Sequence, residues 1–368
     1  MKKKIALVFG GKSAEHEVSV NSARNIAKAI DLEKFDLYGL GISIQGSWYL
    51  FDQVADWEHL KTLSDLKISK DSKAKPCSLI FYQGHPKIQL LQTNQFLDVH
   101  CAFPINHGTF GEDGCIQGYF KMVNLPFVGC DVFSSSLGMD KDFMKRVLTF
   151  AGIPNANFVV LKKNKLPHYD DMIKKIGTPF FIKPANMGSS VGVHKIKTET
   201  DYIEKTKEAF QYDHKLIAEE FIQGREIECS VKGNRWKAEA SVCGEVVPKH
   251  EFYSYEAKYL DDEGASLHIP ADLTQHKSEE LRKLAVTVFE TLACEGMARV
   301  DFFLKKSGEI FVNEINTLPG FTKISMYPKM WEAAGLSYTN LITNLIELAL
   351  DKSKEDQQLN TTFLDLES

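Results

Sequence analysis

Four polar residues near the C-terminal end of the chain have types that could support metal-assisted chemistry: Arg299, Asp301, Glu314 and Asn316. They lie in two apolar-rich runs, 298–304 and 310–316, separated by a short polar segment containing Gly308, and this pattern predicts a β-hairpin. Side chains alternate between the two faces of a strand, and a loop with an even number of residues pairs odd positions with even ones. We therefore expect all four side chains to point to the same side.

The chemistry that this surface could perform depends on what covers it. Carboxylate and amide oxygens are the hard ligands that Mg²⁺ prefers, and Mg²⁺ usually keeps waters and shares its shell with substrate phosphates. Asp301, Glu314 and Asn316 could hold such an ion, with the positive charge of Arg299 beside it. The alternative is the solvated face of an exposed hairpin, in which an ion pair of Arg299 contributes little.

A second candidate site follows the apolar run 179–182. That run leads to Lys183 and then into a loop that contains Ser189 and Ser190, before the chain becomes apolar again. Such a loop can place backbone amides and hydroxyls over phosphate oxygens, while the lysine neutralises their charge. An ordinary hairpin turn would also contain Gly and Ser, so both interpretations remain open at this point.

Glutamates at the end of the next strand could contact a nucleoside. Glu219 and Glu220 end an apolar run, and Glu226 follows a Gly-containing turn. Their oxygens could accept hydrogen bonds from a base or a ribose, although solvated glutamates would look the same. A Gly-rich loop earlier in the chain carries His107 and Glu112; taken singly, these fit a structural histidine and the acidic start of a helix.

The elements that must position these residues fall into two parts. Strands predicted at 5–9 and 96–103, with a helix at about 19–30 between them, indicate a parallel sheet with ligand-binding loops at its carboxyl edge. From about residue 131 the organisation changes, with one serine-capped helix ending at Gly152. The aromatic and polar stretch 247–264 lacks periodicity and is typical of an active-site flap.

Composition limits the class of protein. The 368 residues, 43% of them hydrophobic and 25% charged, are enough for two or three globular domains. A net charge of −5 argues against a surface for nucleic acid. The apolar run at the N-terminus is short for a signal peptide, so we expect a soluble cytoplasmic protein that does not associate with membranes. The 7 cysteines form no CxxC pair and are expected to be reduced, mostly buried thiols.

Taken in order, several segments resemble the ATP-grasp superfamily, and within it the longer form of the D-alanine–D-alanine ligase family. These segments are GGKSAEHEVS, HGTFGEDGCIQG, GMDK, IKPANMGSSVG, EEFIQGREIE, YEAKY, RVDF and NEINTLPGFT. The resemblance implies an α/β protein: an ATP-grasp fold with two α+β lobes and an N-terminal parallel-sheet domain. It implies a domain at 1–130 that contributes to the first D-alanine site, a central lobe at 131–219 with the phosphate loop, and a C-terminal lobe at 220–368 with the flap and the metal site.

Carried over residue by residue, the resemblance implies a nucleotide site and a metal site. ATP would be contacted by Lys141, Lys183, Ser189, Ser190, Glu219, Ile222, Glu226 and Lys258. The first two lysines would meet the phosphates, Glu226 the ribose, and Glu219 and Ile222 the adenosine at the hinge between the lobes. Two Mg²⁺ (or Mn²⁺) ions would be held by Asp301, Glu314 and Asn316, with Glu314 shared.

The same resemblance implies the amino-acid sites. Glu15 would receive the ammonium of the first D-alanine, with His107 nearby, and Arg299 would face its carboxylate and the later oxyanion. The second D-alanine would be held through its carboxylate by Ser325 and by the backbone around Gly320 and Met326, where leucine is common in relatives. A triad that closes the site would consist of Tyr259, Ser189 and Glu15.

The implied activity is the ATP-dependent joining of two D-alanines through a D-alanyl phosphate, with release of ADP and phosphate, for peptidoglycan precursor synthesis. Similar ligases that use D-lactate commonly carry histidine where this chain has Tyr259, so the tyrosine favours D-alanine as second substrate. The alternatives are a ligase for D-serine or D-lactate, and a nucleotide-binding homologue without catalysis. The expected partners are D-alanine, ATP and a second copy of the chain in a homodimer, with no nucleic acid.

Overall fold

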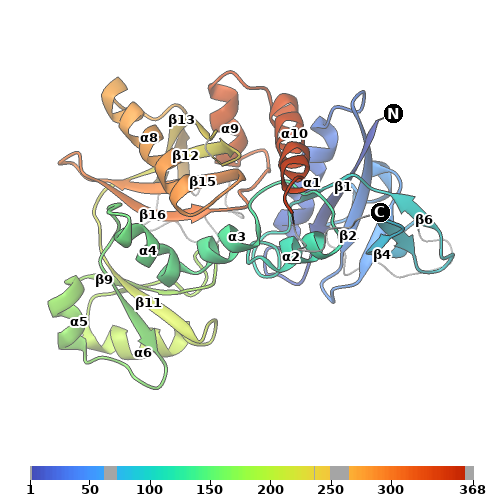
Figure 1. The fold of residues 1–368 in the computed structure, drawn as a ribbon. Coiled ribbons are helices and arrows are strands. Elements are labelled where there is room, and N and C mark those ends of the chain that lie inside the picture. The colour runs from blue at the N-terminus through green and yellow to red at the C-terminus, as the bar shows by residue number, and fades with distance from the viewer. Residues whose placement is uncertain (1, 62–72, 236, 249–264, 361–368) are drawn as a thin grey trace.

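The computed structural model describes residues 2–61, 73–235, 237–248 and 265–360. Its strands form sheets of seven, four and five strands, in that order along the chain (Figure 1). This mixture of a sheet with parallel pairs and two antiparallel sheets confirms the expected α/β class. In the described ranges no helix has the length and apolar character needed to cross a membrane.

The first sheet has a parallel centre and an antiparallel extension. Its elements are β1 (Lys3–Gly10), α1 (His16–Ala29), β2 (Phe35–Ile42), β3 (Trp48–Phe51), η1 (Val54–Asp56), β4 (Lys75–Tyr82), β5 (His85–Leu90), β6 (Phe96–Asp98), β7 (Cys101–Pro104) and α2 (Cys115–Met122). Strand β1 pairs in parallel with β2 and β7, which confirms the predicted parallel core. The remaining strands extend the sheet beyond β2 through antiparallel pairs.

Two local predictions for this half of the chain are wrong. The expected single strand at 96–103 is divided into β6, at the far edge of the sheet, and β7, which lies beside β1. The expected single helix after residue 131 is divided into α3 (Val132–Met139) and α4 (Lys141–Phe150). The helix breaks because Asp140 takes an extended conformation and its carboxylate accepts hydrogen bonds from the Asp142 and Phe143 amides, starting a new helix.

The two later sheets face each other, with α5 (Tyr169–Ile176), α6 (Glu199–Ala209) and α8 (Gln275–Thr291) on their outer faces and α4 between them (Figure 1). The four-stranded lobe contains β8 (Phe158–Lys162), α5, β9 (Phe180–Pro184), β10 (His194–Ile196), α6 and β11 (Lys215–Glu220). The five-stranded lobe contains β12 (Arg225–Gly233), β13 (Glu239–Pro248), β14 (Ala265–His268), α8, β15 (Gly296–Leu304), β16 (Ile310–Asn316) and α9 (Met326–Ala333). Helices α5 and α6 pack on the first of these sheets and α8 on the second, so the opposite faces are left for a cleft.

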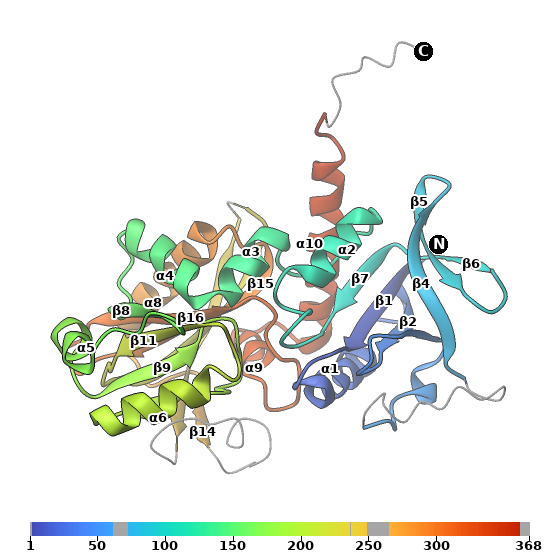
Figure 2. The same cartoon turned by 90° about the horizontal axis from the view of Figure 1, so that it is seen from below.

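The C-terminal helix α10 (Tyr338–Asp356) returns to the first sheet. Its buried side chains, such as Leu341 and Leu345, share a core with Ile5 and Leu7 of β1. Figure 2 shows α10 between the first domain and the remaining lobes. The chain end thus helps to hold the first domain beside the C-terminal lobe.

A close backbone contact joins the end of the first domain to β15. Gly296 has a φ of +73°, and a Cβ added there would lie 2.8 Å from the Gly129 Cα and amide nitrogen. Gly335 also has a positive φ, +92°, but a Cβ there would meet nothing within 4 Å. Alanine substitutions at these two glycines therefore separate two contributions to the free energy of unfolding, that of the positive φ and that of the close backbone contact.

We expect Gly296→Ala to lower the free energy of unfolding by about 3 kcal/mol, because the left-handed conformation and the backbone displacement both oppose a Cβ. Gly335→Ala should lower it by about 1 kcal/mol, since only the backbone angle is unfavourable there. Urea-induced unfolding measures both variants. Equal losses would show that the Gly129–Gly296 approach imposes no constraint.

Candidate active site

The predicted hairpin is present, but a β-bulge and not an even-numbered loop puts its polar side chains on one face. Strands β15 and β16 pair Arg299 with Asn316 and Asp301 with Glu314, as the sequence predicts. The loop between Leu304 and Ile310 has an odd number of residues, however, so the expectation of an even loop is wrong. Asn313 is an extra residue in β16, and this β-bulge restores the pairing beyond it.

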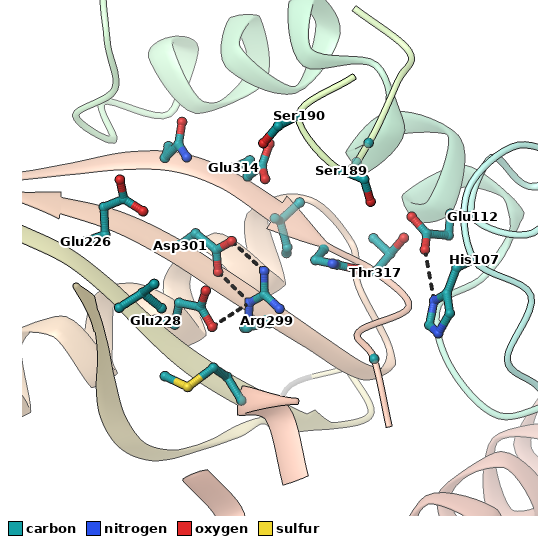
Figure 3. Close-up of a pocket in the computed structure, with 18 of the residues that line it drawn as sticks. His107, Glu112, Ser189, Ser190, Glu226, Glu228, Arg299, Asp301, Glu314 and Thr317 are labelled. Carbon is teal, nitrogen blue, oxygen red and sulfur yellow. Dashed lines mark hydrogen bonds and ion pairs between the residues drawn. The ribbon is translucent and has the colours of Figure 1, made fainter. Parts of the chain in front are cut away.

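Arg299, Asp301, Glu314 and Asn316 all line one large cleft. Figure 3 shows the first three of them. The cleft has a volume of about 320 Å³, which lies within the range of small-molecule pockets. Fourteen expected site residues line it: Glu15, His107, Lys141, Lys183, Ser189, Ser190, Glu226, Arg299, Asp301, Glu314, Asn316, Gly320, Ser325 and Met326. Their roles stay predictions, but the fold brings them together from all three parts of the chain.

Of the other four expected residues, the two that the structure describes, Glu219 and Ile222, are not part of the cleft lining. The side chain of Glu219 is buried between lysines, and Ile222 is buried after the end of β11. Their expected contact with the adenosine stays a prediction. Lys258 and Tyr259 lie outside the described residues, as does nearly all of the expected flap.

Arg299 is held by two carboxylates on the floor of the cleft. Its Nε and Nη2 donate to Asp301 Oδ1 and Oδ2 at 2.7 and 2.8 Å, and Glu228 Oε2 lies 3.0 Å from Nε. Figure 3 shows the guanidinium between these two acids. Burial lowers the pKa of Arg299, but the charges of Asp301 and Glu228 outweigh it and leave the pKa well above its ordinary value.

Two lysines enter the cleft opposite the hairpin, one from the start of α4 and one from β9 of the four-stranded sheet. Lys141 begins α4; its Nζ donates to the Met187 carbonyl at 2.8 Å and lies 3.9 Å from Glu314 Oε2. Lys183 is the next-to-last residue of β9, and its Nζ donates to Glu219 Oε2 at 2.8 Å and to Asn313 Oδ1 at 3.3 Å. Burial lowers the pKa of Lys183, but the nearby carboxylates, above all Glu219, leave it raised. Both lysine side chains therefore face the acidic hairpin.

The loop after β9 connects the central lobe to the first domain. Ser189 and Ser190 both have positive φ values, 53° and 59°, which turn the loop back on itself. The Ser189 hydroxyl donates to Glu15 Oε1, and Glu15 is the N-cap residue of α1. Two of the three residues expected to close the site are therefore in contact, and the third, Tyr259, lies outside the described residues.

A second group occupies the end of the cleft near α1. His107 Nδ1 lies 3.3 Å from Glu112 Oε1, and His107 Nε2 lies 3.2 Å from the Ser22 hydroxyl, so both ring nitrogens are engaged. On the opposite side, the Ser325 hydroxyl bonds to the Thr322 amide and hydroxyl at 2.9 and 2.8 Å. Gly320 lies so close that a Cβ there would be 2.7 Å from the Ser325 oxygen.

The lining contains five polar residues that the sequence did not predict as part of the site: Glu112, which fits a helix start, and Glu228, Asn313, Thr317 and Thr322. For Glu228 the signal was present, because Glu226 and Glu228 alternate with the buried Ile227 and Cys229 in β12. For Asn313 there was none, because a regular strand that turns Glu314 and Asn316 into the cleft would turn Asn313 away, and only the bulge lets Asn313 and Glu314 share one face. All seven cysteines are free thiols, and six are buried.

The hairpin has the oxygen donors expected of a magnesium site. In the described part of the chain, no three His, Cys, Asp or Glu side chains gather closely enough to hold a metal by themselves. Two carboxylates and one amide on a common face suit an ion that completes its shell with waters and phosphate oxygens. The donor set therefore fits Mg²⁺ better than a metal that needs a closed protein cage.

Comparison with known proteins accounts for nearly the whole chain. Residues 4–130 match the family described as D-ala D-ala ligase N-terminus, and residues 147–347 match D-ala D-ala ligase C-terminus. The D-alanine–D-alanine ligase of Oceanobacillus iheyensis is 50% identical over 99% of this chain and 100% of that protein.

Solved structures of ligases of this kind are also similar to this chain. The D-alanine–D-alanine ligase of Coxiella burnetii has a TM-score of 0.87 at 38% identity, covering 97% of this chain and 96% of that one. The VanG D-Ala:D-Ser ligase of Enterococcus faecalis has a TM-score of 0.83 at 33% identity, covering 95% and 100%.

The arginine on the cleft floor leads to a stability prediction. Arg299→Met should lower the free energy of unfolding by about 3–5 kcal/mol, because it leaves two buried carboxylates without their cation. Arg235→Met is the matched control, since its ion pairs with Glu295, Glu355 and Asp356 are partly exposed and should contribute less than about 1 kcal/mol. Urea unfolding of both variants tests the difference; similar losses would contradict the charge balance described here.

Proposed function

This chain belongs to the D-alanine–D-alanine ligase family and is an ATP-dependent ligase, and we propose that it joins two molecules of D-alanine for peptidoglycan precursor synthesis. The observation that carries the proposal is the opposition of charges across the cleft: Lys141 and Lys183 from the central lobe face Asp301, Glu314 and Asn316 from the hairpin. Transfer of a phosphoryl group to a carboxylate needs this arrangement, because both reactants are anions.

Three lobes contribute in this proposal, with boundaries near residues 130 and 219. The first domain, 1–130, supplies Glu15 and His107 to the first D-alanine site. The lobe at 131–219 supplies the phosphate loop, and 220–368 supplies the acidic hairpin. The described sheets support this division, since the second ends at Glu220 and the third begins at Arg225.

At the nucleotide end, Lys141, Lys183, Ser189 and Ser190 contact the phosphates of ATP, and Glu226 accepts a hydrogen bond from the ribose. Glu219 and Ile222 contribute to the hinge through the backbone at the end of β11, since their side chains are turned away from the cleft. Lys258 joins this set from outside the described residues.

The metal ligands in this proposal are Asp301, Glu314 and Asn316, which would hold two Mg²⁺ or Mn²⁺ ions with Glu314 shared. When bound, the ions would offset the negative charge of the phosphates. Asp301 would then be shared between a metal and Arg299, and Glu228 lies close enough to keep the guanidinium in place.

The first D-alanine lies with its ammonium at Glu15 and its carboxylate toward Arg299. An oxygen of that carboxylate attacks the γ-phosphorus of ATP, the bond to the β-phosphate oxygen breaks, and D-alanyl phosphate and ADP form. At about 4 Å, two unit negative charges repel by roughly 4 kcal/mol at an effective dielectric of 20. Lys141, Lys183 and Arg299 offset this repulsion.

The second D-alanine is held through its carboxylate by Ser325 and by the backbone around Gly320 and Met326. Its neutral amine attacks the carbonyl carbon of the acyl phosphate and gives a tetrahedral oxyanion. Nε and Nη2 of Arg299 already bind Asp301, so Nη1 is the donor placed to meet this oxygen. Phosphate leaves, the amine loses a proton, and the dipeptide remains.

The reactive acyl phosphate must be protected from water. Ser189 already bonds to Glu15 at the junction of the loop and the first domain. Tyr259, which lies outside the described residues, is proposed as the third member of a closing triad. A cytoplasmic location and a homodimer complete the proposal, since ATP and D-alanine are intracellular metabolites.

The second substrate could instead be D-serine or D-lactate. The likeness to the VanG D-Ala:D-Ser ligase is the observation that keeps D-serine as a candidate. A nucleotide-binding protein without catalysis is less consistent with the site, because binding alone does not require the acidic hairpin opposite two lysines.

A substrate panel tests the proposed activity. Purified protein with ATP and Mg²⁺ should release phosphate with D-alanine alone, and mass spectrometry should identify D-alanyl-D-alanine. Mixtures of D-alanine with D-serine or D-lactate should yield mainly the same dipeptide near neutral pH. Faster turnover to a mixed product would overturn the assignment of the second substrate, and no phosphate release in any mixture would overturn the activity.

A variant of the hairpin tests the metal ligands. Glu314→Gln should lower phosphate release about a thousandfold, because the shared ligand supplies several kcal/mol of charge stabilisation in the transition state. Glu309→Gln, on the exposed loop of the same hairpin, should retain the normal rate. Circular dichroism should show an intact fold in both variants. A Glu314→Gln variant with near-normal turnover would show that the metal assignment is wrong.

A further inference from the structure

A lysine with no expected role lies beneath the phosphate end of the cleft. Lys145 is one turn after Lys141 in α4, so both side chains leave the same face of the helix. Lys141 lines the cleft, whereas Lys145 is fully buried and does not reach it. Its Nζ lies 3.4 Å from Glu219 Oε1.

Glu219 connects this buried lysine to Lys183. Lys183 on β9 and Glu219 on β11 are diagonal neighbours on adjacent strands, because Lys183 is paired with Ile217. One carboxylate oxygen accepts from Lys183 and the other faces Lys145. Burial raises the pKa of Glu219, but the charges of Lys145 and Lys183 outweigh it, and the pKa lies below its ordinary value. The carboxylate is therefore ionised and shared between two cations.

The far side of Lys183 is held by the β-bulge. Asn313, the extra residue of β16, accepts from Lys183 Nζ at 3.3 Å. The ammonium thus has one partner on its own lobe and one on the opposite lobe. Lys145, Glu219, Lys183 and Asn313 form a continuous chain of contacts that runs from the interior of α4 to the cleft; we call it the lysine frame.

We propose that Lys145 is a positioning residue that acts through Glu219 to keep Lys183 available to the nucleotide phosphates. Burial lowers the pKa of Lys145, and the charge of Glu219 opposes that shift. With both lysines protonated beside one carboxylate, the lysine frame carries one excess positive charge at the cleft. Without Lys145, Glu219 would be balanced by Lys183 alone, and the excess charge that attracts phosphate would be lost. The inference rests on the proposed function in assuming that Lys183 faces phosphate.

The competing explanation is that Lys145 only supports the packing of α4. A buried ion pair does not by itself add stability, because the cost of desolvating the charges can exceed their attraction. A purely structural lysine would affect every ligand of the cleft alike. A lysine that acts through Lys183 should affect only ligands that carry phosphate.

Calorimetric binding of ADP and adenosine, both with Mg²⁺, separates these explanations. Lys145→Met keeps the approximate volume and removes the charge, and we expect ADP to bind about tenfold more weakly while adenosine changes by less than about twofold. In steady-state assays the KM for ATP should rise about tenfold and the KM for D-alanine should not change. Arg146→Met, the adjacent exposed residue that pairs with Asp142, is the control and should leave both affinities unchanged.

A second variant keeps the test decisive if Lys145→Met does not fold. Asn313→Leu removes the acceptor at the other end of the lysine frame and should also weaken ADP selectively over adenosine. Equal weakening of both ligands, or no weakening of either, overturns the inference. The calorimetric measurements need no D-alanine, so a failed substrate panel with a selective loss of ADP binding would overturn the proposed activity and leave this inference standing.

Discussion

Asn313 is an unpaired extra residue in the β15–β16 ladder. Its position in the strand decides which side chains of β16 point into the cleft. Between the loop and the bulge, Phe302 pairs with Val312; beyond the bulge, Asp301 pairs with Glu314. Without the extra residue, the loop that joins the strands would place Asp301 opposite Asn313, with Glu314 turned toward the helix-covered face. A one-residue shift would therefore move a carboxylate from the cleft into the core, where an unpaired charge is very unfavourable.

The balance of charge across the cleft follows from this register. The hairpin presents acids, and Arg299 is held among them by Asp301 and Glu228. The opposite lobe presents Lys141 and Lys183, and Glu219 lies beneath the second lysine. Each charged group has an opposite charge within about 4 Å, and at low local dielectric such pairs are needed if buried charges are to persist. The site is thus preorganised for anionic reactants without a large excess of either sign.

The first domain completes the cleft through a small number of specific contacts. Ser189 of the central lobe bonds to Glu15, and Gly129 touches Gly296 at the start of β15. Helix α10 adds a shared apolar core with β1 and β7. Because these contacts join residues far apart in the chain, the amino-acid end of the cleft is positioned relative to the phosphate end by packing and not by a linker.

The sequence by itself determined the residue types, their alternation along the strands and the order of the motifs. That was sufficient to predict the hairpin, the parallel core around β1, the loop after Lys183 and the family. Glu228 was also within reach, because strand alternation places it beside Glu226. These features depend on period and polarity within short segments, and a sequence records both directly.

Only the tertiary structure decided how the segments meet. Partners distant in sequence decide four features that the sequence did not predict. These are the helix break at Asp140, the division of 96–103 into two strands, the bulge at Asn313 and the burial of Lys145. Local periodicity is the same whether or not a strand bulges or a lysine has a buried carboxylate beside it. The physical reason is that register and burial are set by the contacts that lower the free energy of the whole fold, and those contacts are formed between segments.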